Sequence, residues 1–305
     1  MCARFAERTE PASPAGSATG QETGQELVRA TCPVCEYSGA SAIARHPRVE
    51  FARCGQCGLI YRRSHALEER ADAQAGVFAE PNNPRYSKRG WRRVQKSRHQ
   101  ILDLLNHSDA GPLLDVGCSL AHTLLAAKNL GLPCAGVDVR AQAVNYCRSL
   151  GFRAEIGSLQ ALPFGDGEFQ LVVMKHVLEH TPHPKEALRE VRRVLRSGGG
   201  LFIAVPNGSY RMARRDPQRH KFFRSNSRYG HYVYYEPATL SRLLSDTGFR
   251  VVCVHPHLLH RHASPGVRLL QVLVAPFRLV GQRLLEAFDL RKEFWICAQR
   301  DDEPS

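Results

Sequence analysis

Short apolar runs alternate with helix-like segments along the second half of the chain. The runs are PLLDVG (112–117), CAGVDV (134–139), RAEIG (153–157), FQLVVMK (169–175) and LFIAVPN (201–207). The segments between the first three runs, SLAHTLLAAKNLG and RAQAVNYCRSLG, close on glycine, which commonly ends a helix. Nearly continuous apolar strands separated by helices are typical of a doubly wound, mostly parallel sheet in an α/β fold.

Two further strands follow a polar and basic stretch. Residues 208–236 interrupt the alternation, after which a helix, PATLSRLLSDTG, leads into the strand FRVVCVHP (249–256). A second interruption over residues 257–290 precedes the last strand, EFWICAQR. We therefore expect one seven-stranded domain over residues 111–300, with insertions at 208–236 and 257–290.

The first third of the chain does not continue this pattern. Residues 1–28 are rich in Pro, Gly, Ser, Thr and Ala and are predicted to form a disordered leader. Residues 29–64 form a small cysteine-bearing module, and residues 65–110 form a connector that ends in a helix, RRVQKSRHQILDLLNH. The composition of the 305 residues, with 43% hydrophobic and 23% charged, excludes wholesale disorder and a fibrous repeat.

Targeting and membrane signals are weak in this sequence. No apolar run reaches the ~18 residues that a membrane-spanning helix needs. The first residues also lack the charged-then-apolar pattern of a signal peptide, so we expect a cytoplasmic protein. The segment from Val267 to Phe288 is apolar with arginines spaced along it, which leaves open a core-covering helix pair or a helix on a membrane surface. The oligomeric state is also left open.

Four of the ten cysteines form two closely spaced pairs. Cys32 and Cys35 make one CxxC knuckle, and Cys54 and Cys57 make a second one 18 residues later. The two-residue spacer lets both sulfurs of a knuckle reach one tetrahedral ion at ~2.3 Å, so the pattern predicts a zinc ribbon. A segment this small has little core of its own, and a bound metal would supply its stability. The alternative is a redox-active pair.

Positive charge is concentrated in two segments. The chain has a formal net charge of +13, and residues 85–98 and 208–236 contain most of the excess bases. One interpretation is two solvated basic faces. The other is a focused positive field for an anionic ligand, which would be a phosphorylated small molecule, a nucleotide sugar or RNA.

Polar residues follow the predicted strands at their carboxyl ends, where ligands bind in open α/β sheets. Asp115 and Gly117 end the first strand, and Asp138 ends the second, where a carboxylate can accept hydrogen bonds from both hydroxyls of a ribose. His176 and His180 follow the fourth strand and, on a helix beginning there, would share one face. A dinucleotide site would need a G-x-G-x-x-G loop, and only its first glycine is present, which disfavours NAD.

With these motifs in place, the chain resembles the class I S-adenosylmethionine (SAM)-dependent methyltransferases, from about residue 111 to residue 207 and more loosely beyond. LLDVGC is similar to the first motif of that family, GVDV to the second, and ALPFGDGEFQLVVMKHVLEHTPHPKEALREVRRVLRSGGGLFIAVPN to the third to fifth. The HVLEH and VPN forms resemble the small-molecule branch, which includes ubiquinone-type, sugar and secondary-metabolite enzymes. A zinc ribbon in front resembles enzymes of bacterial surface-glycan and deoxysugar pathways, and also one kind of ribosomal RNA methyltransferase.

The resemblance implies a Rossmann-like methyltransferase fold and a set of SAM-binding residues. Asp115 and Gly117 would hold the methionine end of SAM, in a loop that includes Cys118 and Ser119. Asp138 would bind the ribose. The remaining implied cofactor positions are Val139 on the adenine, Ser158 and Leu159 at the adenine edge, and Lys175 and His176 between cofactor and acceptor. The family pattern has glycine where Ser119 and Ala121 stand, and usually Asp where Ser158 stands.

Histidines are the natural proton acceptors near neutral pH, and three of them are candidates here. His231 lies in the basic insertion, which covers the acceptor in the resembling enzymes, and is the leading candidate; His176 and His180 are the others, each with a purely structural role as the alternative. The predicted activity is methyl transfer to a small, anionic or sugar-like acceptor. An RNA methyltransferase and a binding protein that has lost turnover are the alternatives.

Overall fold

The computed structural model describes residues 31–46, 49–63, 88–220, 222–223, 231–256 and 292–302. The expected leader (1–28), the second insertion (257–290) and the first part of the connector lie outside the described residues. None of the helices in the described ranges combines the length and the hydrophobicity needed to cross a bilayer.

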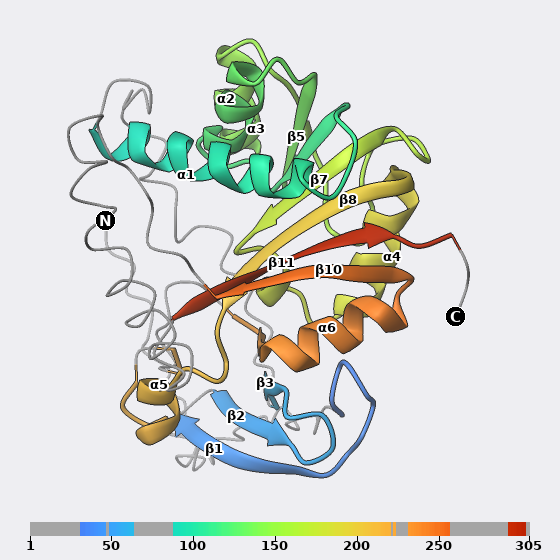
Figure 1. The fold of residues 1–305 in the computed structure, drawn as a ribbon. Coiled ribbons are helices and arrows are strands. Elements are labelled where there is room, and N and C mark those ends of the chain that lie inside the picture. The colour runs from blue at the N-terminus through green and yellow to red at the C-terminus, as the bar shows by residue number, and fades with distance from the viewer. Residues whose placement is uncertain are drawn as a thin grey trace, which may run out of the picture.

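A seven-stranded sheet forms the centre of the molecule (Figure 1). Its strands are β4 (Leu113–Val116), β5 (Cys134–Asp138), β6 (Arg153–Ile156), β7 (Phe169–Lys175), β8 (Leu195–Pro206), β10 (Phe249–Pro256) and β11 (Glu293–Arg300). The spatial order is β10-β11-β8-β7-β4-β5-β6, and only β11 runs antiparallel to its neighbours. The mostly parallel sheet expected from the sequence is therefore confirmed.

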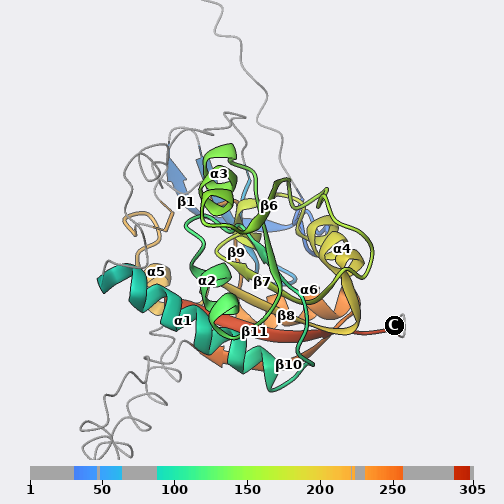
Figure 2. The same ribbon diagram turned by 90° about the horizontal axis from the view of Figure 1, so that it is seen from above.

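Helices cover both faces of this sheet, as a doubly wound fold requires. The helices of one face are α1 (Lys88–Leu105), α2 (His122–Asn129) and α3 (Ala141–Ser149), and those of the other are α4 (Pro184–Val194) and α6 (Pro237–Asp246). Figures 1 and 2 show α1 lying beside α2. The predicted apolar stripe of α1 is buried through Val94, Ile101 and Leu104. Each face of the sheet therefore has its own apolar core.

The transition from α4 to β8 differs from the expectation. The sequence suggests a helix over PKEALREVRRVLRSGG (184–199) and a strand from residue 201, but α4 ends at Val194 and β8 begins at Leu195. Leu195 pairs with Phe169 of β7, and the next pair joins Gly200 to Leu171. The residues between the two pairs form a bulge with Gly198 at a φ of 64°, so the strand starts earlier than its apolar run.

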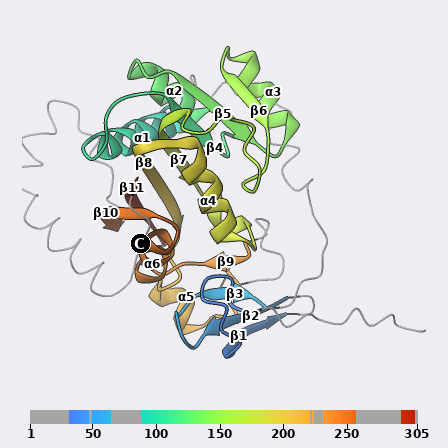
Figure 3. The ribbon, with the colours of Figure 1, turned by 90° about the vertical axis from the view of Figure 1, so that its right-hand side faces the viewer.

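A second, smaller sheet contains the cysteine-bearing module. Its strands β1 (Ala40–His46), β2 (Val49–Cys54) and β3 (Ile60–Arg62) are antiparallel, and β9 (Val233–Tyr234) completes the order β1-β2-β3-β9. Because β9 comes from the insertion after β8, the module and the insertion form one sheet at one end of the molecule (Figure 3). A short helix, α5 (Arg211–Arg215), packs beside this sheet through Ala213.

Polar and apolar contacts join the small sheet to the large domain. Arg53 forms an ion pair of 2.7 Å with Glu236, and the hydroxyl of Thr239 donates to the carbonyl of Cys57 at 2.8 Å. Tyr61, buried on β3, belongs to the same apolar core as α4 and α6. The module is therefore part of the domain's packing and not a separate unit on a linker.

Candidate active site

The carboxyl ends of β4, β5 and β7 meet where the strand order changes direction. In the sheet, β4 lies between β5 and β7, and the chain leaves it toward β5 first and returns later to β7 on the other side. Gly117 directly follows β4, Asp138 is the last residue of β5, and His176 directly follows β7. This switch point is where open α/β sheets bind ligands, so the predicted residues are brought to one edge.

The loop after β4 has a backbone that favours glycine. Gly117, Ser119 and Ala121 all have a positive φ, at 75°, 43° and 57°. A Cβ on Gly117 would lie 2.5 Å from Cγ2 of Val177, so glycine is needed there for space as well as conformation. Ser119 and Ala121 stand where the resembling family has glycine, and the loop keeps the glycine-type conformation at both positions despite their side chains.

Cys118 belongs to the same loop but faces inward. Its side chain is buried, and its Sγ lies 3.5 Å from the Sγ of Cys147 on α3. Its backbone N–H donates to the carbonyl of Val137, as does that of Gly117, at 3.0 and 2.8 Å. These bonds fix the loop against β5, so Cys118 can approach a ligand through its backbone only.

The carboxylate of Asp138 is buried and fully engaged. It accepts hydrogen bonds from the backbone N–H groups of Ser119 and Arg140, both at 3.1 Å. The guanidinium of Arg140 also binds both carboxylate oxygens, at 3.0 and 3.1 Å. A diol that binds Asp138 must therefore replace Arg140. Beside it, Val139 is 68% exposed and offers an apolar surface at the strand end.

Asp115 and Lys175 form a buried electrostatic pair at the ends of β4 and β7. Burial raises the pKa of Asp115 to about 7, with the Lys175 ammonium opposing that rise. Burial lowers the pKa of Lys175 to about 8, and Asp115 opposes that change. The Lys175 ammonium also donates to the hydroxyl of Ser97 on α1 at 2.6 Å. Two groups that are far apart in the sequence thus interact electrostatically at the switch point of the sheet.

Ser158 and Leu159 lie just beyond β6 and are both half-buried. Ser158 forms an isolated bridge with Ala161, and the N–H of Gly157 donates to the carbonyl of Asp138 at 3.2 Å. These contacts bring the segment beside the end of β5. Its position fits the role that the resemblance implies for Ser158 and Leu159, which stays a prediction.

The segment after β7 corrects one expectation. The sequence suggests a helix that starts at His176 and carries His180 on the same face, but His176 has a φ of 55° and only Leu178–His180 form a 3₁₀ turn, labelled η2. The backbone N–H of His176 still pairs with Ala204 of β8 at 2.9 Å, so strand pairing continues where the helix was expected. Helix α4 begins only at Pro184.

His176 lies between two carboxylates. Its Nδ1 is 3.3 Å from Oε1 of Glu179, and its Nε2 is 3.0 Å from Oε2 of Glu293 on β11. Burial alone would lower the pKa of His176, but the hydrogen bonds to the two carboxylates raise it to about 9. His176 is therefore a charged imidazolium at neutral pH. Lys96 of α1 binds the other oxygen of Glu293 at 2.6 Å and extends the network.

Glu179 connects this network to the insertion. Its side chain is 0% exposed, and its Oε2 has no hydrogen-bond partner among the described residues. Its Oε1 lies 3.9 Å from Nε2 of His231, and its carbonyl accepts from the N–H of Tyr232 at 2.8 Å. The same carboxylate oxygen, Oε1, thus faces both His231 and His176.

His180 and His231 complete the cluster. Their ring centroids are 4.7 Å apart, and one ligand atom from each of Glu179, His180 and His231 lies within 4.8 Å of the others. Nδ1 of His231 is 3.3 Å from the hydroxyl of Tyr234, which itself donates to the carbonyl of Phe222. Burial lowers the pKa of His231 to about 4, with Glu179 opposing. His231 is therefore neutral at neutral pH.

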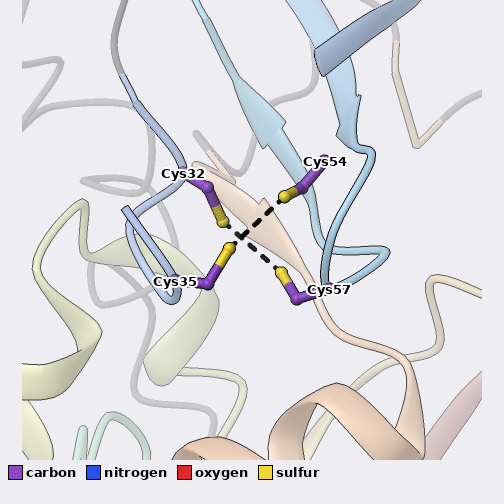
Figure 4. A group of neighbouring side chains, drawn as sticks. All are labelled: Cys32, Cys35, Cys54 and Cys57. Carbon is purple, nitrogen blue, oxygen red and sulfur yellow. Dashed lines mark hydrogen bonds between the residues drawn. The ribbon is translucent and has the colours of Figure 1, made fainter. Parts of the chain in front are cut away.

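The four predicted metal-binding cysteines converge (Figure 4). The Sγ atoms of Cys32 and Cys57 are 3.5 Å apart, and those of Cys35 and Cys54 are 3.4 Å apart. All four are free thiols whose Sγ atoms lie within 4.8 Å of one another. A tetrahedral ion bound at ~2.3 Å separates its sulfurs by about 3.8 Å, so the four thiols fit such an ion with a small expansion.

Several residues of this site carry no local sequence signal. Glu293 reaches His176 only because β11 pairs antiparallel with β8, and Ser97 reaches Lys175 only because α1 lies over the sheet. Arg140, directly after the GVDV motif, could have been suspected as a partner of Asp138 from its spacing. Glu293 and Ser97 can be recognised as part of the site only from the tertiary structure.

A family model described as a methyltransferase domain matches residues 86–254, which is more than half of the chain. The chain belongs to this methyltransferase family. SAM is the cofactor expected for the fold. The match runs from α1 into β10, including the segment that supplies β9, and leaves strand β11 and the cysteine-bearing strands β1 to β3 outside.

Individual relatives match shorter parts of this chain. It is 31% identical over 100 residues to ajmaline N-methyltransferase of Rauvolfia serpentina, which is 30% of this chain and 34% of that protein. It is 31% identical over 98 residues to an uncharacterised methyltransferase of Bacillus subtilis, which is 30% of this chain and 39% of that one. The chain thus spans little more than a third of these relatives.

A solved structure shows the same fold. It is a chain from the complex between the Trm112 methyltransferase activator of Haloferax volcanii and a methyltransferase, with a TM-score of 0.51 and 15% identity. The match covers 75% of this chain and 96% of that chain. At this identity the similarity concerns the fold.

The positive φ angles of the cofactor loop predict opposite effects at two positions. Gly117→Ala should destabilise the protein by more than about 1 kcal/mol, because the new Cβ would contact Val177 in a left-handed backbone. Ser119→Gly should stabilise it by up to about 1 kcal/mol, because glycine removes the left-handed strain. Urea unfolding measures both free energies. Equal destabilisation by the two changes would contradict the described loop.

The engagement of Asp138 predicts how SAM affinity responds to mutation. Asp138→Ala should raise the Kd for SAM about 10- to 100-fold, because hydrogen bonds to a charged acceptor are lost. Arg140→Ala is the matched control: it frees the same carboxylate and should leave the affinity unchanged or tighter. Isothermal titration calorimetry measures the Kd for SAM of each variant, and thermal unfolding checks that each variant is folded. Unchanged affinity of Asp138→Ala would exclude Asp138 from the cofactor site.

Proposed function

We propose that this methyltransferase transfers a methyl group from SAM to a small acceptor that carries negative charge, of the sugar or secondary-metabolite kind. The observation that carries the proposal is the pairing of a neutral His231 with the buried carboxylate of Glu179, next to the cofactor edge of the sheet. Ring contacts add His180 to this pair.

The cofactor edge has groups suited to each part of SAM. The loop at Gly117 brings backbone close to a ligand, and the ionisable Asp115 is suited to the ammonium of the methionine end. Asp138 would bind the ribose after exchange with Arg140, and Val139 would pack on the adenine. SAM supplies a methyl group on a positively charged sulfur, and catalysis of its transfer depends mainly on proximity and alignment.

Proton removal is assigned to His231 in this proposal. The hydroxyl of Tyr234 donates to Phe222, so its oxygen is available to accept from Nδ1–H of His231. That contact leaves the lone pair on Nε2, which can accept a proton from the acceptor. The resulting imidazolium would be stabilised by Glu179 at 3.9 Å. His180 is the neighbouring candidate for this step.

His176 has a different proposed role. As a charged imidazolium between Glu179 and Glu293 it has no lone pair to accept a proton. Its positive charge lies against the buried carboxyl group of Glu179 and compensates it. His176 is thus proposed as the residue that positions Glu179, and His231 as the base.

Exposed bases support a negatively charged acceptor. Arg214 and Arg215 on α5 and Arg92 and Arg93 on α1 are exposed, and the chain carries a net charge of +13. A focused positive field raises the local concentration of anionic ligands. RNA would use the same field, and a steep loss of RNA affinity with salt would favour the RNA methyltransferase instead.

Cys32, Cys35, Cys54 and Cys57 are proposed to hold one structural zinc ion. Their Sγ spacing and the absence of disulfides among them support this assignment. A four-thiolate shell leaves no position for a substrate, so the proposed ion stabilises the fold and takes no part in the chemistry.

Native mass spectrometry of the purified protein tests the proposal. We expect one zinc per chain and a retained S-adenosyl ligand, with an acceptor retained in part of the population. Cys54→Ser should lose the zinc, because three thiolates bind it more weakly than four. A protein without S-adenosyl ligand that also fails to bind SAM in calorimetry would be a binding protein without turnover, and the proposal would fail.

A further inference from the structure

Arg62, at the end of ribbon strand β3, has no acidic partner in the part of the chain that the structure describes. Arg53 and Arg63 on the same module pair with Glu236 and Glu50, whereas no ion pair between described residues involves Arg62. Its side chain is half-buried, and its Nε is buried without a hydrogen-bond acceptor. A guanidinium that is removed from water without an anion is unfavourable unless a ligand supplies one.

Strand pairing places Arg62 against Tyr232, the residue that follows the proposed base. Its backbone N–H donates to the carbonyl of Tyr232 at 2.8 Å, and its guanidinium carbon lies 5.2 Å from the centre of the Tyr232 ring. Tyr232 directly follows His231, and its own N–H binds the carbonyl of Glu179 at 2.8 Å. Two successive backbone contacts therefore connect Arg62 to the Glu179–His231 pair.

Electrostatic coupling agrees with this placement. Burial raises the pKa of Tyr234, with Glu179 adding to the rise and Arg62 opposing it, so both groups act on one hydroxyl. That hydroxyl is also the one 3.3 Å from Nδ1 of His231. Arg62, Tyr234 and His231 are thus within one neighbourhood, formed jointly by the ribbon and the insertion.

The surroundings of Arg62 are aromatic. Ile60, on the same side of β3, packs with Tyr234 and with Ala213 of α5, whose neighbours Arg214 and Arg215 are exposed. The cation–π contact with Tyr232 orients the guanidinium and leaves its N–H groups for other partners. A planar guanidinium of this kind binds carboxylate or phosphate through two parallel hydrogen bonds.

We infer that Arg62 is the anion-binding residue of the acceptor site, and that the ribbon contributes it to recognise a phosphate or carboxylate group on the acceptor. This inference rests on the proposed function and names the residue that would select the acceptor. It also gives the ribbon a part in substrate binding, because the pairing of β3 with β9 sets the distance between Arg62 and His231.

Calorimetric titration of the full chain with inorganic phosphate, and separately with acetate, at low ionic strength tests this inference. The wild type should bind at least one of the two anions saturably. Arg62→Met should weaken that binding about tenfold or more, and Arg62→Lys should weaken it less, because lysine keeps the charge and loses the planar fork. The anion bound more tightly identifies the group that the acceptor carries.

Arg63→Met is the matched control. It removes the same charge one residue further along, from a side chain that already contacts Glu50 and the carbonyl of Ala40. Its anion affinity should stay within about twofold of the wild type. Equal weakening by both variants, or no saturable binding to the wild type, would overturn the inference.

Zinc content and SAM affinity, measured on the same samples, show whether weaker anion binding in Arg62→Met has another cause, such as a misfolded ribbon. Both should be unchanged in Arg62→Met, which shows that the ribbon is folded and the cofactor edge intact. Arg62-dependent anion binding in a protein that fails to bind SAM would refute the proposed methyl transfer and keep the anion site.

Discussion

The buried carboxyl group of Glu179 is the constraint on which the proposed acceptor site depends. An ionised carboxylate with no exposed surface is stable only when compensating charge is close. His176 supplies that charge, and Glu293 on β11 and Lys96 on α1 hold His176 in turn. The strained backbone of His176 and the short η2 turn are the local consequences of bringing these groups together.

The cysteine-bearing module extends the same constraint. Its strand β3 pairs with β9, and Tyr232, immediately before β9, holds the backbone of Glu179. The module also contacts α6 through Thr239 and Cys57. A metal held by the four thiolates would therefore stabilise more than a small ribbon. It would also fix the segment that carries His231, which explains physically why a module of this size is packed into the domain.

The sequence predicted much of the fold, because its signals were local. The apolar runs matched all seven strands of the large sheet, and Gly131 and Gly151, after α2 and α3, have a φ of 74° and 80°, typical of helix ends. The convergence of the four cysteines also followed from spacing alone. Strand β9 could not be predicted in the same way, since two residues, Val233 and Tyr234, join a sheet far away in sequence.

The candidate site was predictable in its residue types and less so in its connections. The position of Gly117, Asp138 and His176 at one edge of the sheet followed from motifs at strand ends, which the fold brings together by topology. The helix expected at His176 did not form there, because its N–H completes the pairing with β8. The roles of Glu293 and Arg62 depend on antiparallel pairing between strands that are distant in the sequence. The hydrogen bonds from the Arg140 guanidinium to Asp138 depend on the side-chain conformation of Arg140. Periodicity and spacing carry no information on such contacts.

The central claim is that Glu179 lies between one charged and one neutral histidine. Nitrogen-15 NMR of the imidazole side chains measures this directly, with His176→Gln and His231→Gln variants to assign the signals. Near neutral pH, His176 should have both ring nitrogens protonated and should lose a proton only toward pH about 9. His231 should be neutral and take up a proton only toward pH about 4. A neutral His176 together with a charged His231 near pH 7 would contradict the account.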